Sequence, residues 1–382
     1  MNQDKKKYLR SLLFRHLDGI ALCSPISALN KHGITEYIKI HPIFSSQDLF
    51  SQFQSNTGYL NITLRLLASQ GWLKQDILED GANIHYKLTE KGEKFIKISQ
   101  HYDPFSEFIP TLINIEQYLF NQNSKYIFDE FSILLTNLKS FTKKNSNMLS
   151  PEWEIGKHLE GIIIGPILVA FGMSDFFLEN IESNIAIDKS AIGNDLNLLW
   201  LIMEYFIYLG WVENKANLFK FTEEGTFFMK RASAYGVTVS YLPTFQRVRE
   251  LLFGDPNVLW KQSTTNLETH VNRRMNVWGS GGAHSLYFNR IDEIVTDIFN
   301  QPIEEQPIGI ADMGCGDGTL LKHLYHVVKH YTLRGQNLDL YPLKIIGADF
   351  NKAARLASTL TLKEANIEFS IIHGDISNPD DY

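Results

Sequence analysis

A glycine-rich turn that begins with an acidic residue is the segment of the sequence best suited to bind a small molecule. It follows the apolar run 308–311 and contains Asp312, Gly314, Gly316, Gly318 and Thr319. The first glycine allows a sharp turn off a strand, the second lets a ligand approach the backbone, and the third allows a helix to pack closely. A nicotinamide cofactor is disfavoured, because its fingerprint Gly-x-Gly-x-x-Gly would need glycine where Thr319 stands.

Two later apolar runs also end in acidic residues. The run 345–350 ends in Asp349-Phe350, and the run 369–376 ends in Gly374-Asp375-Ile376. A carboxylate at a strand tip accepts hydrogen bonds from both hydroxyls of a ribose, and an adjacent ring packs against adenine. Asp349 or Asp375 taken singly could instead cap the start of a helix. The three acidic strand ends together predict one site for an adenosyl ligand.

These residues require a parallel sheet to bring them together. From about residue 307, short apolar runs alternate with helical patterns, which indicates an α/β fold. The helix after the glycine turn is expected to bury Leu320, Leu324, Val327 and Tyr331. An insertion at 333–342 is expected to lengthen a loop at the edge of the sheet away from the ligand.

In their order, these segments resemble the motifs of the class I S-adenosylmethionine (SAM) methyltransferases. The resemblance implies that the glycine turn cradles the methionine end of SAM and that the strand-end acid orients the turn. It also implies that the later segments bind the ribose and the adenine. The predicted cofactor-binding residues are Asp312, Gly314, Cys315, Gly316, Asp349, Phe350, Asp375 and Ile376.

An internal repeat organises the first two-thirds of the chain. The order of helices, a Gly-Trp pair, two strands and a Thr-Glu-x-Gly helix start occurs around Gly71-Trp72 and Thr89, and again around Gly210-Trp211 and Thr222. This order is typical of winged-helix units.

Winged helices often bind DNA, but the helices in the position of the DNA-recognition helix have few of the basic residues that DNA binding needs. The helix expected at 57–69 has one basic residue, Arg65, and the helix expected at 194–208 has none. We therefore expect an interaction or lid module rather than a nucleic-acid partner.

The predicted fold is α/β, with a helical lid of two winged-helix-like units followed by a partial Rossmann-like class I methyltransferase core. The predicted domains are a first winged-helix-like unit at 1–102, a helical connector at 103–150, a second unit at 151–240, lid-to-core helices at 241–300, and the N-terminal half of the SAM-binding domain at 301–382. Three strands fit in the last segment where this class has seven, so we expect a truncated core that continues beyond Tyr382.

The whole chain resembles the methyltransferase domains of polyketide synthase loading modules, those followed by an acetyltransferase-like domain and a carrier protein. The segment Trp278-Gly279-Ser280-Gly281-Gly282-Ala283-His284-Ser285 and the duplicated lid carry this resemblance. It implies C-methylation of a malonyl group on an acyl carrier protein, in contact with neighbouring synthase domains. It also implies a mononuclear iron or another divalent metal that acts as a Lewis acid. The metal ligands are expected beyond Tyr382.

The substrate side is less marked in the sequence. His284 is the candidate catalytic residue, because it follows a flexible Gly281-Gly282, although a loop or helix-capping histidine fits the pattern equally well. Tyr241 and Arg247 are candidate substrate residues at the passage from lid to core, where an arginine could meet a carboxylate.

A further set of side chains at helical spacing consists of His323, His326 and His330. This spacing could hold a metal, but surface histidines are favoured.

Two other functions stay open on the sequence alone. One is a small-molecule O-methyltransferase, although such enzymes normally have one winged unit. The other is a truncated methyltransferase that serves as a non-catalytic adaptor.

Composition excludes several other classes of protein. Apolar residues make up 44% of the 382 residues, which is ordinary for a globular chain, and the net charge of −7 is a poor match for nucleic acid. The chain has only two cysteines, so a disulfide framework is not expected. We expect a cytoplasmic protein with no membrane association.

Overall fold

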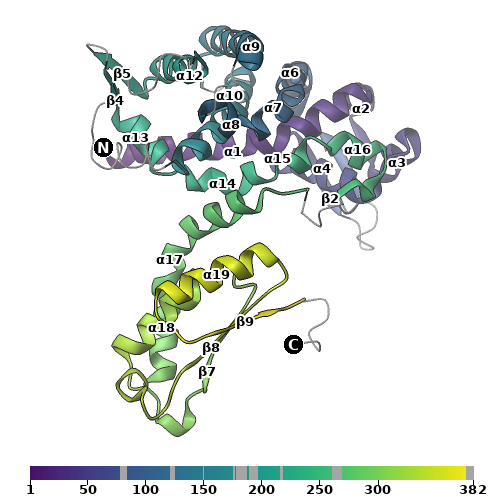
Figure 1. The fold of residues 1–382 in the computed structure, drawn as a ribbon. Helices are drawn as coiled ribbons and strands as arrows, with labels where there is room; N and C mark the ends of the chain where they lie inside the picture. Colours follow the sequence, from purple (N-terminus) through teal and green to yellow (C-terminus); the bar gives the residue numbers. More distant parts are fainter. Residues whose placement is uncertain are drawn as a thin grey trace. The chain divides into compact units, whose positions relative to one another are not determined.

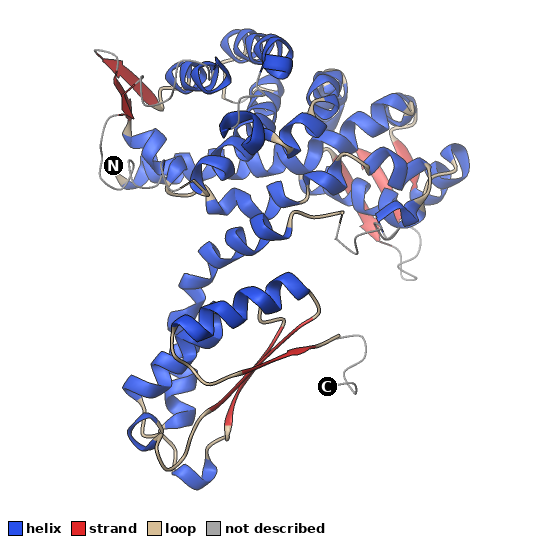
Figure 2. Cartoon of the chain, in the orientation of Figure 1, coloured by secondary structure: helices blue, strands red, loops and turns tan. Residues whose placement is uncertain are grey.

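The computed structural model describes residues 1–77, 84–120, 125–148, 150–174, 177, 187–188, 197–215, 218–259 and 269–375. The chain divides into two compact units, Met1–Asn276 and Val277–Tyr382. The fold is mixed α/β and mostly helical, with two small antiparallel sheets in the first unit and a parallel sheet in the second (Figures 1 and 2).

The first repeat contains five helices and a three-stranded sheet. Its elements are α1 (Gln3–Lys31), α2 (Ile34–Ile40), β1 (Ile43–Ser45), α3 (Ser46–Phe53), α4 (Thr57–Ser69), β2 (Leu73–Ile77), β3 (Ile84–Leu88) and α5 (Glu90–Ile96). The strand order is β1-β3-β2, and both pairs are antiparallel. The sequence predicted β2 and β3, while β1 has only three residues and escaped notice.

The connector between the repeats is a series of helices rather than one amphipathic helix. It contains η1 (Ser99–Tyr102), α6 (Asp103–Glu107), α7 (Ile109–Ile113), α8 (Ile115–Phe120) and α9 (Lys125–Lys144). Pro104 and Pro110 lie in the first turns of α6 and α7, where proline fits a helix start but not a helix interior. These two prolines divide the segment.

The described elements of the second repeat follow the order of their counterparts in the first. It contains α10 (Pro151–Gly172), β4 (Ile187–Asp188), α12 (Asn197–Tyr208), β5 (Val212–Lys215), β6 (Leu218–Phe221) and α13 (Glu223–Met229). Its strands are arranged as β4-β6-β5, in the same way as β1-β3-β2. The elements that follow are α14 (Ser233–Ser240), α15 (Leu242–Phe245), α16 (Val248–Phe253) and η3 (Pro256–Leu259).

A threonine holds the end of the first winged unit together. The Thr89 hydroxyl donates to the Gly71 carbonyl (2.7 Å) and accepts from the Gly92 amide (2.9 Å), so it caps α5. Trp72, between these elements, is buried and stacks on Phe95 at a centroid distance of 4.4 Å.

The second winged-helix unit has the equivalent contacts. The Thr222 hydroxyl donates to the Gly210 carbonyl (2.8 Å) and accepts from the Gly225 amide (3.2 Å). Trp211 stacks on Phe228 at 4.2 Å. The duplication seen in the sequence is therefore a duplication of tertiary structure.

The two repeats meet through α1 and α10, which cross at two glycines. A Cβ atom on Gly19 would overlap the backbone of His158, and one on Gly161 would overlap the backbone of His16. The two helices therefore approach as closely as their backbones allow, with each glycine against the histidine of the other copy.

Each of these histidines bonds to a tyrosine of the other copy. His16 Nδ1 lies 2.8 Å from the Tyr235 hydroxyl, and His158 Nδ1 lies 2.6 Å from the Tyr102 hydroxyl. All four side chains are buried. The pairs relate the two repeats by an approximate two-fold symmetry within one chain.

The symmetry fails at the second nitrogen of each histidine. His16 Nε2 lies 3.1 Å from Glu160, whereas His158 Nε2 is buried with no partner among the described residues. Asp18 takes the place of Glu160 in the first copy, and its side chain is one methylene shorter.

Both core helices are long and apolar enough, by length and composition alone, to cross a membrane. In the structure 72% of the apolar window of α1 and 94% of that of α10 are buried within the protein. Packing in the core of the first unit therefore explains their composition.

The second unit contains α17 (Arg273–Phe299, which begins in the first unit), η4 (Ile303–Glu305), β7 (Gly309–Met313), α18 (Thr319–Tyr331), η5 (Gly335–Asn337), β8 (Lys344–Asp349), α19 (Lys352–Glu364) and β9 (Ser370–His373). The strands are parallel in the order β7-β8-β9, and α18 and α19 provide the crossovers. The insertion at 333–342 precedes β8 and so lies at the amino edge of the sheet, as predicted.

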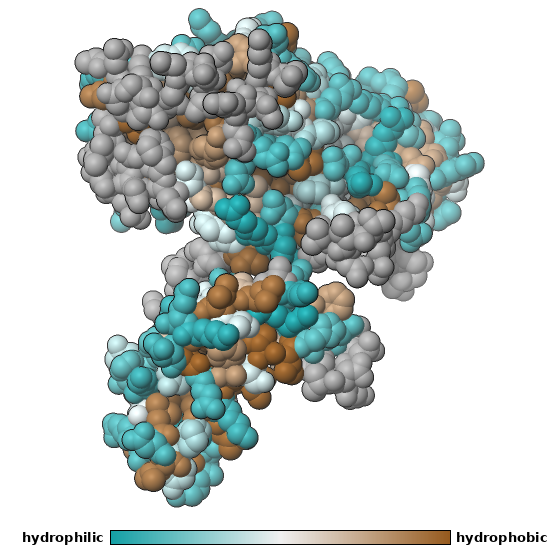
Figure 3. All heavy atoms as spheres, viewed as in Figure 1, coloured by the Kyte–Doolittle hydropathy of each residue, from teal (hydrophilic) through white to brown (hydrophobic). Residues whose placement is uncertain are grey.

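The surface of this unit mixes polar and apolar side chains. Figure 3 shows apolar residues, in brown, over the region of α19, where Leu356 and Leu360 are more than half exposed. The apolar stripe of α18 is rotated from the predicted one: Leu321, Leu324, Val327 and Val328 are buried, whereas Tyr331 is 73% exposed.

Candidate functional site

Three of the predicted acidic residues lie at the carboxyl edge of one sheet. Asp312 is near the end of β7, Asp349 is the last residue of β8, and Asp375 follows β9 by two residues. Asp312 pairs in register with Gly347, and Asp349 pairs with His373. Because β8 lies between β7 and β9, the three acids share one edge of the sheet.

The glycine turn leaves β7 at this edge with three left-handed residues. The φ angles are 89° at Gly314, 56° at Gly316 and 78° at Gly318. A Cβ atom on Gly314 or Gly316 would meet nothing within 4 Å, so the turn presents open backbone there. Such backbone is what a close-lying ligand requires.

Gly318 has a different role, because its surroundings are filled. A Cβ atom there would lie 2.9 Å from the Cβ atom of Ser358 on α19. The sequence predicted that this glycine brings a helix close to the sheet. In the structure it brings the start of α18 close to α19 instead.

Asp349 fixes the glycine turn from the neighbouring strand. Its Oδ2 accepts a hydrogen bond from the Gly316 amide at 3.1 Å, and its Oδ1 accepts from the Asn351 amide at 2.8 Å. Each carboxylate oxygen has a second lone pair, so the group can still accept hydrogen bonds from a ligand. The sequence predicted an orienting role for Asp312, and this bond shows that Asp349 also holds the turn.

The backbone after Asp349 is held by an arginine that the sequence did not single out. Arg355 Nη1 donates to the carbonyls of Asp349 (2.8 Å) and Phe350 (2.7 Å). No local motif marks Arg355, so only its position six residues after the strand-end acid could have suggested it.

An aromatic pair lies beside the acidic edge. The Phe350 ring is 65% exposed, and its centroid is 5.4 Å from that of His373, with the planes at 45°. His373 ends β9 next to Asp349 and was also missed from sequence. An exposed pair of rings at this place offers a surface for a planar base.

Cys315 lies in the turn, but its side chain points into the core. It is 5% exposed, and its Sγ atom is 3.8 Å from the Ser358 hydroxyl. Burial raises the pKa of the Cys315 thiol. Any contact of this residue with a ligand in front of the turn would therefore use its backbone.

The remaining predicted residues lie elsewhere or outside the described residues. Ile376 is outside them. Tyr241 and Arg247 belong to the first unit, where Arg247 lies 3.7 Å from Glu250 across one helical turn. They do not belong to the unit that holds the glycine turn.

His284 lies in α17, in a segment that was expected to be flexible. Gly281 and Gly282 are part of one continuous helix from Arg273 to Phe299, so this expectation was wrong. Two glycines weaken a helix by about 1 kcal/mol each, which long flanking helical segments can offset. The His284 side chain is outside the described part of the structure.

The histidines of α18 have structural contacts. His323 Nε2 lies 2.6 Å from Asp292 of α17, and the imidazole stacks on Phe288. The rings of His326 and His330 stack on each other. No group of three His, Cys, Asp or Glu side chains suited to a metal ion occurs among the described residues.

Taken together, the parallel sheet, the open glycine turn and the strand-end carboxylates define a methyltransferase-like domain. Comparison with protein families agrees with this class. Residues 268–382 match the AprA MT2-like domain, residues 160–255 match the AprA winged helix domain, and residues 9–75 match the AprA N-terminal domain.

The chain is an AprA-like protein with these three domains in order. AprA is a methyltransferase of a polyketide synthase loading module, which is the family that the sequence resembled. No curated protein matches the chain.

The site residues fit the cofactor that a methyltransferase domain implies. Open backbone at Gly316 leaves room for a ligand to lie against the turn, and the Asp349 carboxylate beside it retains free lone pairs. A metal centre is different, because the described residues provide no ligand set for one.

Proposed function

We propose that the protein is a SAM-dependent methyltransferase that C-methylates a malonyl or related acyl group on an acyl carrier protein, in the formation of a polyketide starter unit. The observation that carries this proposal is the open turn at Gly314 and Gly316 beside the Asp349 carboxylate. The AprA-like domain order supports the polyketide context. The proposed partners are the carrier protein and neighbouring synthase domains, in the cytoplasm.

SAM supplies a methyl group on a positively charged sulfonium centre. The turn at Gly314 and Gly316 would lie against its amino acid portion, and Asp349 would accept from its ribose hydroxyls. Phe350 and His373 would flank the adenine, with Asp375 at its polar edge. The Asp312 carboxylate, half-buried at the end of β7, would face the cofactor's ammonium group.

Asp349 links cofactor binding to the shape of the turn. Its hydrogen bond to the Gly316 amide holds the turn in place before any ligand arrives, so the ligand does not have to order it. Because the described residues provide no metal ligand set, we assign no step to a metal ion.

Calorimetric titration of the full chain with SAM tests the cofactor site. We expect Asp349→Asn to weaken SAM binding by about ten- to a hundredfold, since hydrogen bonds to a charged group are worth about 1.5–3 kcal/mol. Asp339→Asn is the matched control, because Asp339 is exposed in the insertion at the opposite edge of the sheet. Absence of SAM binding by the unmodified chain, or equal binding by Asp349→Asn, would refute the proposal.

A second experiment identifies the methyl acceptor. The chain is incubated with methyl-labelled SAM and either a malonyl-loaded carrier protein or a set of free phenols. Label on the carrier supports the proposal, while label on phenols identifies an O-methyltransferase. Binding of SAM without transfer to either acceptor would favour a non-catalytic adaptor.

A further inference from the structure

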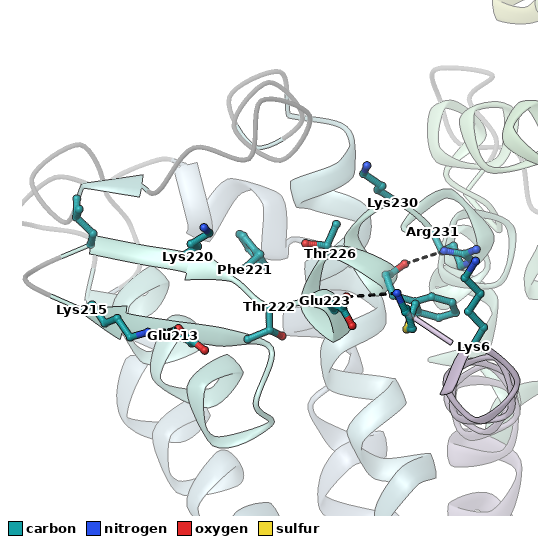
Figure 4. Close-up of a pocket in the computed structure, with 13 residues that line it drawn as sticks. Lys6, Glu213, Lys215, Lys220, Phe221, Thr222, Glu223, Thr226, Lys230 and Arg231 are labelled. Atoms are coloured by element: carbon teal, nitrogen blue, oxygen red, sulfur yellow. Dashed lines mark hydrogen bonds and ion pairs between the residues drawn. The ribbon is translucent and has the colours of Figure 1, made fainter. Parts of the chain in front are cut away.

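The second winged unit contains a pocket with an excess of positive charge, far along the chain from the glycine turn. The pocket has a volume of about 920 Å³, within the usual range for small-molecule sites. It is formed by the start of α1, strands β5 and β6, and α13 (Figure 4). Its cationic side chains are Lys6, Lys215, Lys220, Lys230 and Arg231.

The acidic residues of the pocket are already neutralised. Glu213 forms an ion pair with Lys215 at 2.8 Å. Glu223 lies 3.6 Å from Lys5 and also contacts the terminal amino group. Lys6, Lys220, Lys230 and Arg231 form no ion pair with the described residues, although Lys220 lies near enough to Glu213 to help lower the pKa of that carboxyl. The pocket therefore has more positive than negative side chains in a chain whose net charge is −7.

Comparison of the two repeats shows that the lysine at this helix end is paired in the first copy and has no ion-pair partner among the described residues in the second. Thr89 and Thr222 are equivalent, so Lys97 corresponds to Lys230 and Glu93 corresponds to Thr226. In the first copy Glu93 neutralises Lys97 at a distance of 2.7 Å.

The second copy has replaced that acid with a hydroxyl group and has added a further cation. Threonine stands in the place of Glu93, and Arg231 stands in the place of Ile98. The first copy has Lys91 and Lys94 where the second has Glu224 and Phe227, so the copies differ in where their cations lie and how they are paired, not in a greater number of cations in the second. The adjacent cations Lys230 and Arg231, without an ion-pair partner among the described residues, are the difference that we relate to binding.

The pocket also has an apolar part. Phe221 of β6 is half-buried, and Leu218 at the start of the same strand is 37% exposed. Arg231 stacks over the Phe227 ring at 3.9 Å and donates to the Phe227 carbonyl, so its guanidinium group is held in place. Burial, together with the charge of Arg10, lowers the pKa of Arg231.

We propose that this pocket binds an organic phosphate ester with several negative charges and an uncharged arm. The cations would contact the phosphate oxygens, and Phe221 and Leu218 would contact the arm. The proposal does not depend on methyl transfer, because the pocket lies in the compact unit Met1–Asn276 and the glycine turn lies in the compact unit Val277–Tyr382.

Coenzyme A serves as the probe, and pantetheine, which lacks phosphate, is its control ligand. Binding to the full chain is measured by calorimetry at low salt and again at higher salt. We expect coenzyme A to bind with an affinity that falls as salt rises, and pantetheine not to bind. SAM is titrated in parallel, so that failure of one site is distinguished from failure of the other.

Two pairs of charge reversals test the location. Lys220→Glu with Lys230→Glu should weaken coenzyme A binding at least about tenfold, which corresponds to 1.4 kcal/mol. Lys87→Glu with Lys97→Glu makes the same change at the equivalent positions of the first copy and should alter the affinity less than about twofold. Circular dichroism confirms that both variants are folded.

Four outcomes would overturn the proposal. These are no binding of coenzyme A, equal binding of pantetheine, equal weakening by both pairs of reversals, and tighter binding of duplex DNA than of coenzyme A at the same salt. The last outcome would identify a nucleic-acid surface, which the absence of basic residues from α12 disfavours.

Discussion

Mild acid should destabilise the N-terminal unit, because His158 is buried there in its neutral form. The side chain is fully buried between α1 and α10, where burial, and then the charges of Arg15 and Lys91, lower the pKa of His158 to about 3. In the unfolded chain the same group titrates near 6.5. Below pH 6.5 the unfolded state therefore binds a proton that the folded state does not.

The sign and size of the effect follow from proton linkage. The contribution of His158 to stability is fully present above pH 6.5 and is lost as the pH falls toward 3. At pH 5 the loss of stability is roughly 2 kcal/mol, because pH 5 lies about 1.5 units below the pKa of the unfolded state and each unit corresponds to about 1.36 kcal/mol. Burial also lowers the pKa of His16, which therefore acts in the same direction.

Glu160 does not contribute in this pH range. Burial alone would raise its pKa, but the charge of Lys157 and the hydrogen bond from His16 lower the pKa of Glu160 to about 2. Its stabilising contribution is lost only as the pH falls below about 4.5. The window from pH 5 to pH 7 therefore excludes the titration of Glu160.

Urea unfolding followed by tryptophan fluorescence measures this effect. Trp72, Trp153, Trp200 and Trp211 lie in the N-terminal unit, so the signal reports mainly on it. His158→Gln should reduce the slope of unfolding free energy against pH by about one proton near pH 5, whereas His85→Gln, at an exposed position of β3, should leave it unchanged. Equal slopes for the unmodified chain and His158→Gln would contradict the buried, neutral state of His158.

The other predictions concern glycines at close approaches. Gly161→Ala should destabilise the N-terminal unit by about 2 kcal/mol or more in the same urea assay, because the new methyl group overlaps the His16 backbone. Gly58→Ala, at a roomy position of α4, should leave stability unchanged or raise it by up to about 1 kcal/mol. Gly318→Ala should cost about 1–3 kcal/mol in the thermal stability of the second unit, through its contact with Ser358 and its left-handed backbone. A stability equal to that of the parent chain would argue against the close packing of α18 on α19.

Most of the fold could be predicted because the strong signals in the sequence are local. The Gly-Trp and Thr-Glu-x-Gly phrases mark the end of one helix and the start of another, and the structure confirms both copies. The short strands β1 and β4 were missed, since two or three residues show no alternation. The connector was predicted as helical, but its division into separate helices was not, because its apolar spacing continues across two prolines that start new helices.

The cofactor edge could be predicted in outline and not in its contacts. The acidic residues at the strand ends can be recognised in the sequence, because each follows an apolar run. The contact of Asp349 with the glycine turn depends on strand order and register, which place Asp349 opposite the turn. His373 and Arg355 were missed for the same reason, since their partners are set by the sheet and by the backbone after β8.

The segment around His284 shows how composition can mislead. Gly281 and Gly282 suggested a flexible segment, but α17 continues through them. Helix propensity is a weak preference, and long flanking segments override it.

In a dimer of two identical chains, every mutation appears in both subunits, on both sides of the two-fold axis. When both halves belong to one polypeptide, each half can drift alone, and this chain records such drift at Asp18 against Glu160 and at Glu93 against Thr226. A substitution can therefore change the contacts of one half and leave those of the other half as they are.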